Sequence, residues 1–169
     1  MKTKLFLFST LVIAFSFLSI GCTQQAQNVS SSSPDNFLET KECFNCDLTG
    51  KDLSGVDLSD AKLNGSDLSG ANLAGVNLSG ALLDGVNFTG ANLTDANLTT
   101  AALANTNLTG ANLSNADLTK AFLRSANLTG ANLSNADFKE ADLNAATLEE
   151  AQLKTANFQG AIMPDGTVK

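Results

Sequence analysis

The chain contains no histidine, and only three of its 169 residues are cysteine. Without histidine it has no Ser/His/Asp or Cys/His arrangement, and it also lacks a glycine–lysine motif that would cradle a phosphate. The scarcity of histidine and cysteine argues against a zinc site as well. We therefore predict a protein that is not an enzyme and that has no catalytic residues, no cofactor and no metal.

Basic residues are also scarce. Lysine and arginine together number 10 against 17 acidic residues, and none lies between Lys62 and Lys120. The formal net charge is −7, and it becomes −9 when an N-terminal segment carrying Lys2 and Lys4 is removed. A surface of this sign repels phosphates, so we expect no nucleic acid partner and no electrostatic attraction to an anionic membrane surface.

Only one long apolar run is present, from Leu5 to Leu18, and its 14 residues are too few for a comfortable membrane span. It follows two lysines, as in a secretory signal. The run ends in Leu18-Ser19-Ile20-Gly21-Cys22, which resembles a bacterial lipobox and implies that Cys22 receives lipid and becomes the new N-terminus. Ser19 stands where a lipobox most often has leucine. Cleavage by an ordinary signal peptidase and a retained anchor helix therefore stay open.

Residues 23–35 have almost no apolar content and include a run of serines, a composition typical of a disordered tether. A tether behind a lipidated cysteine is a common arrangement in envelope lipoproteins. We therefore expect an exported, lipid-anchored protein of the cell envelope, on the periplasmic side of a bacterial membrane. Thr23 favours the outer membrane over the inner one, and a thylakoid lumen is also compatible.

The rest of the chain is dominated by a period of five residues. From Cys46 to Asp165 there are 24 pentads, each with one large apolar residue, which we call the centre. The centres run from Leu48 to Met163 and are almost all leucine, and the residue two before the centre is usually alanine. A helix needs apolar residues at a spacing of about 3.6 and a strand at 2, so a strict five fits neither.

A coil with four short sides and four corners does fit this period. The centre and the residue two before it leave an extended segment on the same side, so both can point inward while the others face out. A turn must follow each centre, because Gly, Asn and Asp are frequent there and tolerate the positive φ of a type II turn. Four pentads then complete a coil of 20 residues.

The pentads ANLSG, ANLTG and ADLTK match the motif A(D/N)LXX, so residues 46–165 resemble the pentapeptide-repeat family. The resemblance implies an all-β fold, a right-handed quadrilateral parallel β-helix of about six coils with four pentapeptides each. We accordingly divide the chain into five segments. They are a signal peptide (1–21), the lipidated cysteine and tether (22–35), an N-terminal cap (36–46), the β-helix (47–165) and a C-terminal tail (166–169).

Corner chemistry changes along the repeat. From Leu48 to Leu93 the residue two after each centre is always Gly or Asp, and later it often is not. Positive φ is costly for bulky or β-branched residues. We therefore predict other turn types at seven later corners: Thr100, Lys120, Ser125, Glu140, Ala145, Glu150 and Thr155.

Cys43 and Cys46 lie where the period, extended backwards, places a centre and the next inward corner residue. In an exported protein such a pair is expected to be structural, as packed thiols or as a disulfide. A thioredoxin-type redox site and a metal site are the functional alternatives. Neither has support nearby, because no strand–helix context surrounds the pair and the chain has no histidine.

Residues 20 apart should stack, so the residues just before the centres form four outward columns. Three of these columns are almost entirely Asp and Asn, which can form amide ladders. The fourth contains Leu82, Ala102, Phe122 and Ile162, and we call these four residues the apolar stripe. It is the candidate surface for an unknown protein partner or for self-association. Scattered surface hydrophobes, which are common, are the alternative.

These features favour an exported, lipid-tethered rod that acts as a non-catalytic protein-binding or structural module. The alternative is an acidic DNA mimic that inhibits a topoisomerase, because some members of the family inhibit DNA gyrase as acidic rods shaped like a duplex. Export would remove such a mimic from its target, and Asn outnumbers Asp in the middle of the repeat.

Replacement of the lipobox cysteine tests the anchor. In the variant Cys22→Ser, we expect the protein to leave the membrane fraction or to accumulate as uncut precursor, because no thiol is available for lipidation. Fractionation followed by immunoblotting measures both. A Cys22→Ser protein that is processed normally and stays on the membrane would contradict lipidation.

Overall fold

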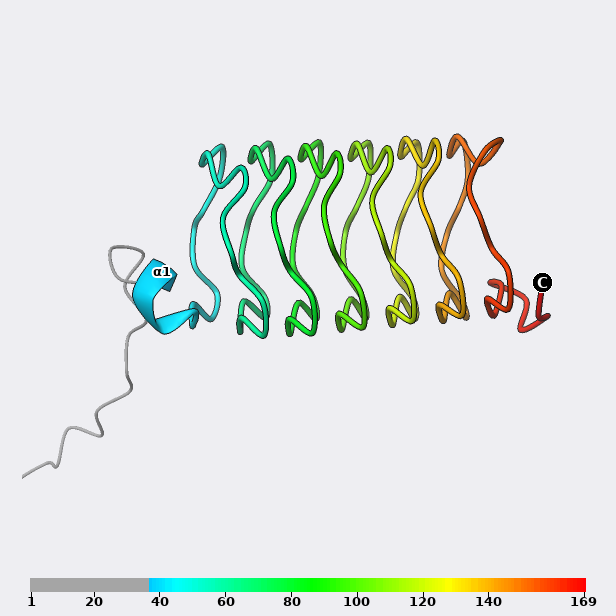
Figure 1. Cartoon of the computed structure of the whole chain (residues 1–169), viewed down its shortest axis with the longest axis horizontal. Helices are drawn as coiled ribbons and strands as arrows, with labels where there is room; N and C mark the ends of the chain where they lie inside the picture. Colours follow the sequence, from blue (N-terminus) through cyan, green and yellow to red (C-terminus); the bar gives the residue numbers. More distant parts are fainter. Residues whose placement is uncertain (1–36) are drawn as a thin grey trace, which may run out of the picture. The chain divides into compact units, whose positions relative to one another are not determined.

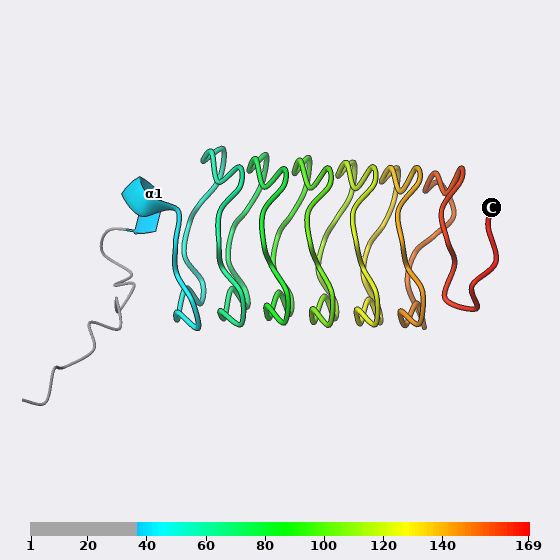
Figure 2. The same cartoon turned by 90° about the horizontal axis from the view of Figure 1, so that it is seen from below.

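The computed structural model describes residues 37–169. The proposed signal peptide, Cys22 and the tether lie outside the described residues. Within them, one short helix, α1 (Phe37–Thr40), precedes a series of coils that follow one another along a single axis (Figures 1 and 2). No helix in this part of the chain has the length and hydropathy needed to cross a bilayer.

The coils are joined by parallel β-bridges between residues 20 apart. The bridges run without interruption from Glu42↔Lys62 to Asp142↔Ile162, and each side of a coil contributes a single bridged residue. At each bridge the hydrogen bonds alternate in direction between neighbouring coils. The Leu48 N–H donates to the Asp67 carbonyl at 2.8 Å, and the Asp67 N–H donates to the Cys46 carbonyl at 2.8 Å. The chain is therefore a parallel β-helix with 20 residues in each turn.

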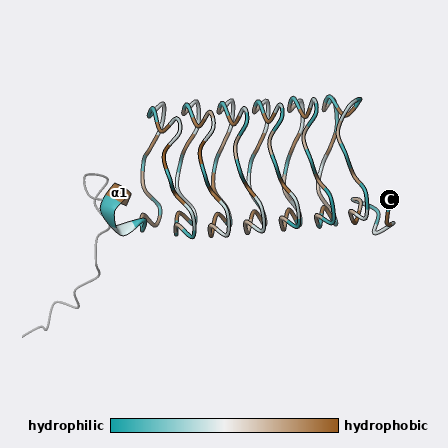
Figure 3. Cartoon of the chain, in the orientation of Figure 1, coloured by the Kyte–Doolittle hydropathy of each residue, from teal (hydrophilic) through white to brown (hydrophobic). Residues whose placement is uncertain are grey.

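The core is a column of centres flanked by alanines. Leucine centres from Leu58 to Leu143 are fully buried, and so are almost all the alanines two positions before them. The two larger rings Phe88 and Phe138 are also buried, and Phe138 stacks on Phe158 with 5.1 Å between ring centroids. Apolar and polar residues alternate along every coil (Figure 3). Each buried leucine contributes about 2 kcal/mol, so the core is built from many equal increments.

The corners do not change as expected. Every corner from Gly50 to Glu150 has a positive φ at the residue two after the centre. Six of the seven corners predicted to differ, Thr100, Lys120, Ser125, Glu140, Ala145 and Glu150, have φ of 57–59°. The prediction of other turn types was wrong at these six positions.

The ladder between coils explains this result. At five of these six corners the N–H donates to a carbonyl of the next coil, as the Thr100 N–H does to the Thr119 carbonyl at 3.0 Å. A different turn at one corner would break this bond, so the neighbouring coils impose the turn on residues that disfavour it. Thr155 has no positive φ, and there the Asn135 N–H donates to the Thr155 hydroxyl instead of to a carbonyl.

The Asp and Asn columns form the expected ladders. In most pentads the side-chain oxygen just before the centre accepts the N–H two residues on, as Asn92 does from Thr94. The Asn92 amide also donates to the Asn72 oxygen of the preceding coil at 3.0 Å, and the Asn72 amide donates to Asp52 at 2.9 Å. The N–H of Ser59, its hydroxyl and Lys41 hold the pKa of Asp57 well below its usual range, at about 2.

The two ends of the β-helix are covered differently. At the N-terminal end Phe37 of α1 is buried against the core, whereas Leu38 is exposed. At the C-terminal end residues 166–169 are not a free tail. The chain turns back after Met163 so that Val168 forms an antiparallel bridge with Ile162, and the Lys169 N–H donates to Ala161. The centres of the last coil remain only partly buried.

A glycine at a strained corner should stabilise the fold. Thr100 holds φ at 57°, a conformation that costs a non-glycine residue about 1–2 kcal/mol, and glycine's extra backbone entropy offsets roughly half of that gain. We expect Thr100→Gly to raise the free energy of unfolding by up to about 1 kcal/mol in urea denaturation. The control Thr119→Gly, one residue before a corner, should lower it. An equal loss in both variants would contradict strain at Thr100.

Candidate interaction surface

The fourth column lies on one outer side of the β-helix. Parallel bridges connect Lys62, Leu82, Ala102, Phe122, Asp142 and Ile162 in that order. Leu82 and Phe122 project to solvent with 42% and 52% of their surface exposed, and Ala102 between them is half-buried. The structure thus brings three members of the apolar stripe together on adjacent coils.

Ile162 differs from the other members of the stripe. It is half-buried, because residues 166–169 turn back and Val168 pairs with it, and Asp142 separates it from Phe122. The continuous apolar surface therefore consists of Leu82, Ala102 and Phe122. Sequence periodicity gave the column correctly but did not reveal that the end of the chain folds onto its last position.

Ion pairs bound this apolar surface at both ends. On the N-terminal side Lys62 Nζ lies 2.8 Å from Glu42 Oε1, and both side chains are about half exposed. On the C-terminal side Arg124 Nε donates to Asp142 Oδ2 at 2.5 Å. Burial acts to raise the pKa of Asp142, but the bonds from Arg124 and from the Asn144 N–H hold that pKa below its usual range.

The backbone on this side has no regular Asx turn in the coils where Lys62, Leu82, Ala102 and Phe122 stand before the centre, because these residues carry no acceptor. The Ala104 N–H donates instead to Asp84 Oδ1 of the preceding coil at 3.0 Å. Asp84 therefore leans towards the coil that contains Ala102 and Ala104. On the other three sides, the Asn and Asp side chains form hydrogen bonds within the chain, whereas this side presents apolar groups and charges to solvent.

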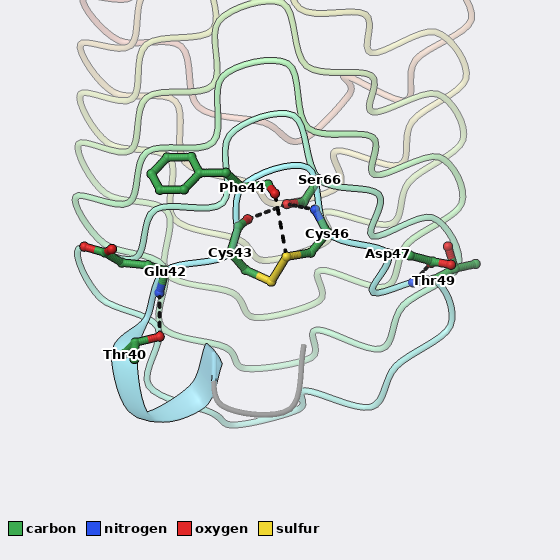
Figure 4. The surroundings of a disulfide bond; sticks show 8 residues. All are labelled: Thr40, Glu42, Cys43, Phe44, Cys46, Asp47, Thr49 and Ser66. Atoms are coloured by element: carbon green, nitrogen blue, oxygen red, sulfur yellow. Dashed lines mark hydrogen bonds between the residues drawn. A yellow bond between two sulfur atoms is a disulfide. The ribbon is translucent and has the colours of Figure 1, made fainter. Parts of the chain in front are cut away.

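A second column, formed by residues one after the centres, runs beside the first. It contains Phe44, Asn64, Asp84, Ala104, Arg124, Asn144 and Pro164. Phe44 is 46% exposed and projects outward on the same side as Glu42 (Figure 4). Our sequence interpretation missed Phe44 as a surface residue of this side. The period extended backwards places Phe44 in this column, one residue after the centre position of Cys43.

Comparison with known proteins identifies the repeat. A family model described as pentapeptide repeats matches eight copies, at residues 43–73, 71–110, 96–135, 106–144 and 123–160. The chain belongs to the pentapeptide-repeat family. Proteins of this family form a right-handed quadrilateral β-helix, and the parallel bridges between residues 20 apart agree with that fold. No curated protein matches the chain closely enough to count as a relative.

Several solved pentapeptide-repeat structures are similar to the chain. One is HetL, involved in heterocyst differentiation regulation in the cyanobacterium Nostoc, with 36% identity over 76% of this chain and 66% of HetL, and a TM-score of 0.34. The chain thus spans about two thirds of the length of HetL. Another comes from the Arabidopsis thaliana thylakoid lumen, with 35% identity over 63% of this chain and 71% of that one, and a TM-score of 0.43.

The plasmid-mediated fluoroquinolone resistance protein QnrB1 is also similar, with 23% identity over 76% of this chain and 74% of that one, and a TM-score of 0.48. Identity at this level concerns the fold alone.

The two cysteines form a disulfide at the start of the repeat. Cys43 and Cys46 are buried, with 5.6 Å between their Cα atoms. The Ser66 hydroxyl donates to the Cys43 carbonyl at 2.6 Å and accepts from the Cys46 N–H at 3.0 Å (Figure 4). At the later corners the equivalent N–H donates directly to the centre carbonyl. At this first corner the Ser66 hydroxyl thus links the Cys46 N–H to the Cys43 carbonyl, beside the disulfide.

The described residues offer no evident metal site. Among residues 37–169 no group of three or more His, Cys, Asp or Glu side chains is placed to hold a metal ion. The one buried carboxylate in this part of the chain, Asp142, is already paired with Arg124.

Removal of Arg124 should raise the pKa of Asp142. In Arg124→Ala the burial of Asp142 is no longer offset by a cation, so NMR titration should show a higher pKa for this carboxyl. The control Lys120→Ala removes a cation that lies 3.6 Å from the half-exposed Glu140. This control should leave the pKa of Asp142 unchanged. An unchanged pKa of Asp142 in Arg124→Ala would contradict the conclusion that Arg124 lowers it.

The same variant should show a pH-dependent loss of stability. A depressed folded pKa adds stability that is present above the unfolded value of about 4 and is lost as the pH falls through the folded pKa. Arg124→Ala should therefore lower the midpoint of thermal unfolding at pH 7 by more than it does at pH 2–3.

Proposed function

We propose that the chain is an exported, lipid-tethered binding protein. Its β-helix, of about six coils, acts as a non-catalytic module that presents the apolar stripe to a protein partner or to a second copy. The observation that carries this proposal is the exposure of Leu82 and Phe122 in line, one coil to either side of Ala102. The other three columns before the centres consist almost entirely of Asn and Asp.

The energetics of the stripe support a binding role. Complete burial of an exposed leucine or phenylalanine contributes about 1.5–3 kcal/mol, so Leu82 and Phe122 can anchor an interface. Their backbone is fixed by bridges on both sides, so little conformational entropy is lost when they are covered. An apolar strip with a charged border is also the usual composition of an interface core and its rim.

The outer surface gives little support to catalysis. Carboxylates such as Glu149 and Glu150 are exposed to solvent, whereas catalytic acids and bases are typically found in clefts that bury them. Pentapeptide-repeat proteins are generally structural or binding modules, which agrees with the same conclusion. We therefore propose no reaction for this chain.

The disulfide supports an exported location. Disulfides persist in oxidising compartments and are rare in the cytosol, and Cys43–Cys46 is formed in the structure. Together with the lipobox at Cys22, it favours the cell envelope, with the membrane contacted through the lipid. The same argument disfavours the alternative of a DNA mimic that acts on a cytosolic topoisomerase. That alternative is also disfavoured by the Asn ladders along the columns, which carry no charge.

The anchor Phe122 provides the test. We expect the full-length Phe122→Ser protein to fold normally, because the side chain is 52% exposed, and to lose a partner that the parent protein retains from detergent-solubilised membranes. Quantitative mass spectrometry of the pull-down measures the loss, and circular dichroism measures folding. The control Leu38→Ser removes an equally exposed apolar side chain from α1. Identical partner sets and identical self-association in parent and Leu82→Ser/Phe122→Ser proteins would contradict the proposal.

A further inference from the structure

The fourth column has a symmetric arrangement of residue types about Ala102. One coil away on either side lie Leu82 and Phe122, which are both apolar and exposed. Two coils away lie Lys62 and Asp142, which have opposite charges. If the column is reversed and placed against itself, apolar residues therefore meet apolar residues and the lysine meets the aspartate.

The neighbouring column has the same symmetry about Ala104. Asp84 and Arg124 lie one coil away on either side and have opposite charges. Asn64 and Asn144 lie two coils away, and Phe44 and Pro164 lie three coils away. On reversal, the charged residues, the amides and the apolar residues each meet a suitable partner. Two independent columns thus share one centre of symmetry, at the coil that contains Ala102 and Ala104.

We propose that this face binds a second copy of the chain in an antiparallel, two-fold symmetric dimer. The two-fold axis lies across the face, perpendicular to the β-helix axis, at the level of Ala102. Such an axis reverses the order of the coils but keeps each column opposite itself, so the same patch is used by both subunits. The inference rests on the proposed function and names the occupant of its surface.

Electrostatics favour the second copy as the partner. A pair of identical acidic proteins repels overall, so a self-contact needs local cations opposite local anions. None of the other three columns before the centres contains a lysine or an arginine. The proposed face supplies two complementary pairs per dimer half, Lys62 with Asp142 and Asp84 with Arg124.

Arg124 is placed to serve both subunits. It bonds Asp142 of its own chain through Nε, and a guanidinium has further N–H donors at its terminal nitrogens. Asp84 leans towards the coil of Ala104, which is the coil at the two-fold axis. Arg124 of one copy can therefore reach Asp84 of the other without release of Asp142.

One pair does not match. Three coils from Ala102 the first column has Glu42 on one side and Ile162 on the other. Glu42 is already paired with Lys62, and Ile162 is half-covered by the end of the chain. The contact is therefore centred on the five coils from Lys62 to Asp142.

The contact is small, which sets the expected affinity. With roughly 10 Å for one side and about 5 Å per coil, five coils present on the order of 250 Å² per copy. Stable dimers bury about 800 Å² per partner, so the dimer should form reversibly at high protein concentration.

Crosslinking through introduced cysteines tests the arrangement. The full chain carrying Ala102→Cys should give covalent dimers with a short bismaleimide, because position 102 faces itself across the axis. The control Asn92→Cys changes a residue of similar burial in another column and should give only the background set by the parent chain. Equal yields from Ala102→Cys and Asn92→Cys would overturn the proposal.

The direction of the two chains is tested separately. In the antiparallel dimer position 82 lies about 10 Å along the axis from its own mate, but directly opposite position 122. A mixture of Leu82→Cys and Phe122→Cys chains should therefore crosslink more than either variant alone. A yield from Leu82→Cys alone that equals the mixture would indicate parallel chains and overturn the antiparallel arrangement.

Charge reversal gives an independent measurement. Lys62→Glu places two acidic groups opposite each other, so sedimentation equilibrium should show at least a tenfold weaker self-association. The control Lys51→Glu makes the same charge change at an exposed site outside both columns. Equal weakening by both variants would overturn the specific pairing.

Failure of the dimer differs from failure of the binding function. If the chain stays monomeric at high concentration but Phe122→Ser still loses a membrane protein in the pull-down, the dimer is wrong and the binding surface stands. If neither result depends on Phe122, both proposals fail.

Discussion

The parallel ladder between residues 20 apart is the constraint on which the rest of the structure depends. Each backbone N–H and carbonyl of a bridged residue is committed to a neighbouring coil, so the chain cannot slip by one residue without loss of the whole ladder. Position within the pentad then decides the environment of every side chain. Leucine fills the interior, Asp and Asn line three outer sides, and whatever replaces them on the fourth side is presented to solvent.

Sequence periodicity predicted the fold, the interior and the four columns, because all three follow from register alone. It failed where interactions between coils override local preference. Thr100 and Glu140 adopt left-handed corners that their side chains disfavour, since a different turn would break hydrogen bonds to the next coil. Periodicity also could not indicate that residues 166–169 cover Ile162, because that contact lies beyond the last repeat. The state of Cys43 and Cys46 remained open from sequence, because register places both side chains inward but does not decide between two thiols and a disulfide.

The polar ladders and the proposed recognition surface occupy different sides of the same coil. On three sides each Asp or Asn caps a turn, and many of them also bond a neighbouring coil, so the polar groups are largely satisfied within the chain. On the fourth side, Leu82, Ala102 and Phe122 have no side-chain oxygen or amide that could form those hydrogen bonds. The loss is spread along a ladder that remains intact in the backbone, so the fold tolerates it. A repeat of this kind can therefore change the outward residues of one column without disturbance of the interior.

The amide ladders also have a direction. Where an Asn amide of these columns bonds another coil, it donates towards the preceding one. The first members of the three columns, Asp47, Asp52 and Asp57, accept but have no proton to donate. A further coil stacked beyond them would meet three carboxylates without a donor in return. The exposed end of a β-helix can pair with another chain and so extend into a fibre. The three carboxylates of the first coil disfavour such pairing at this end.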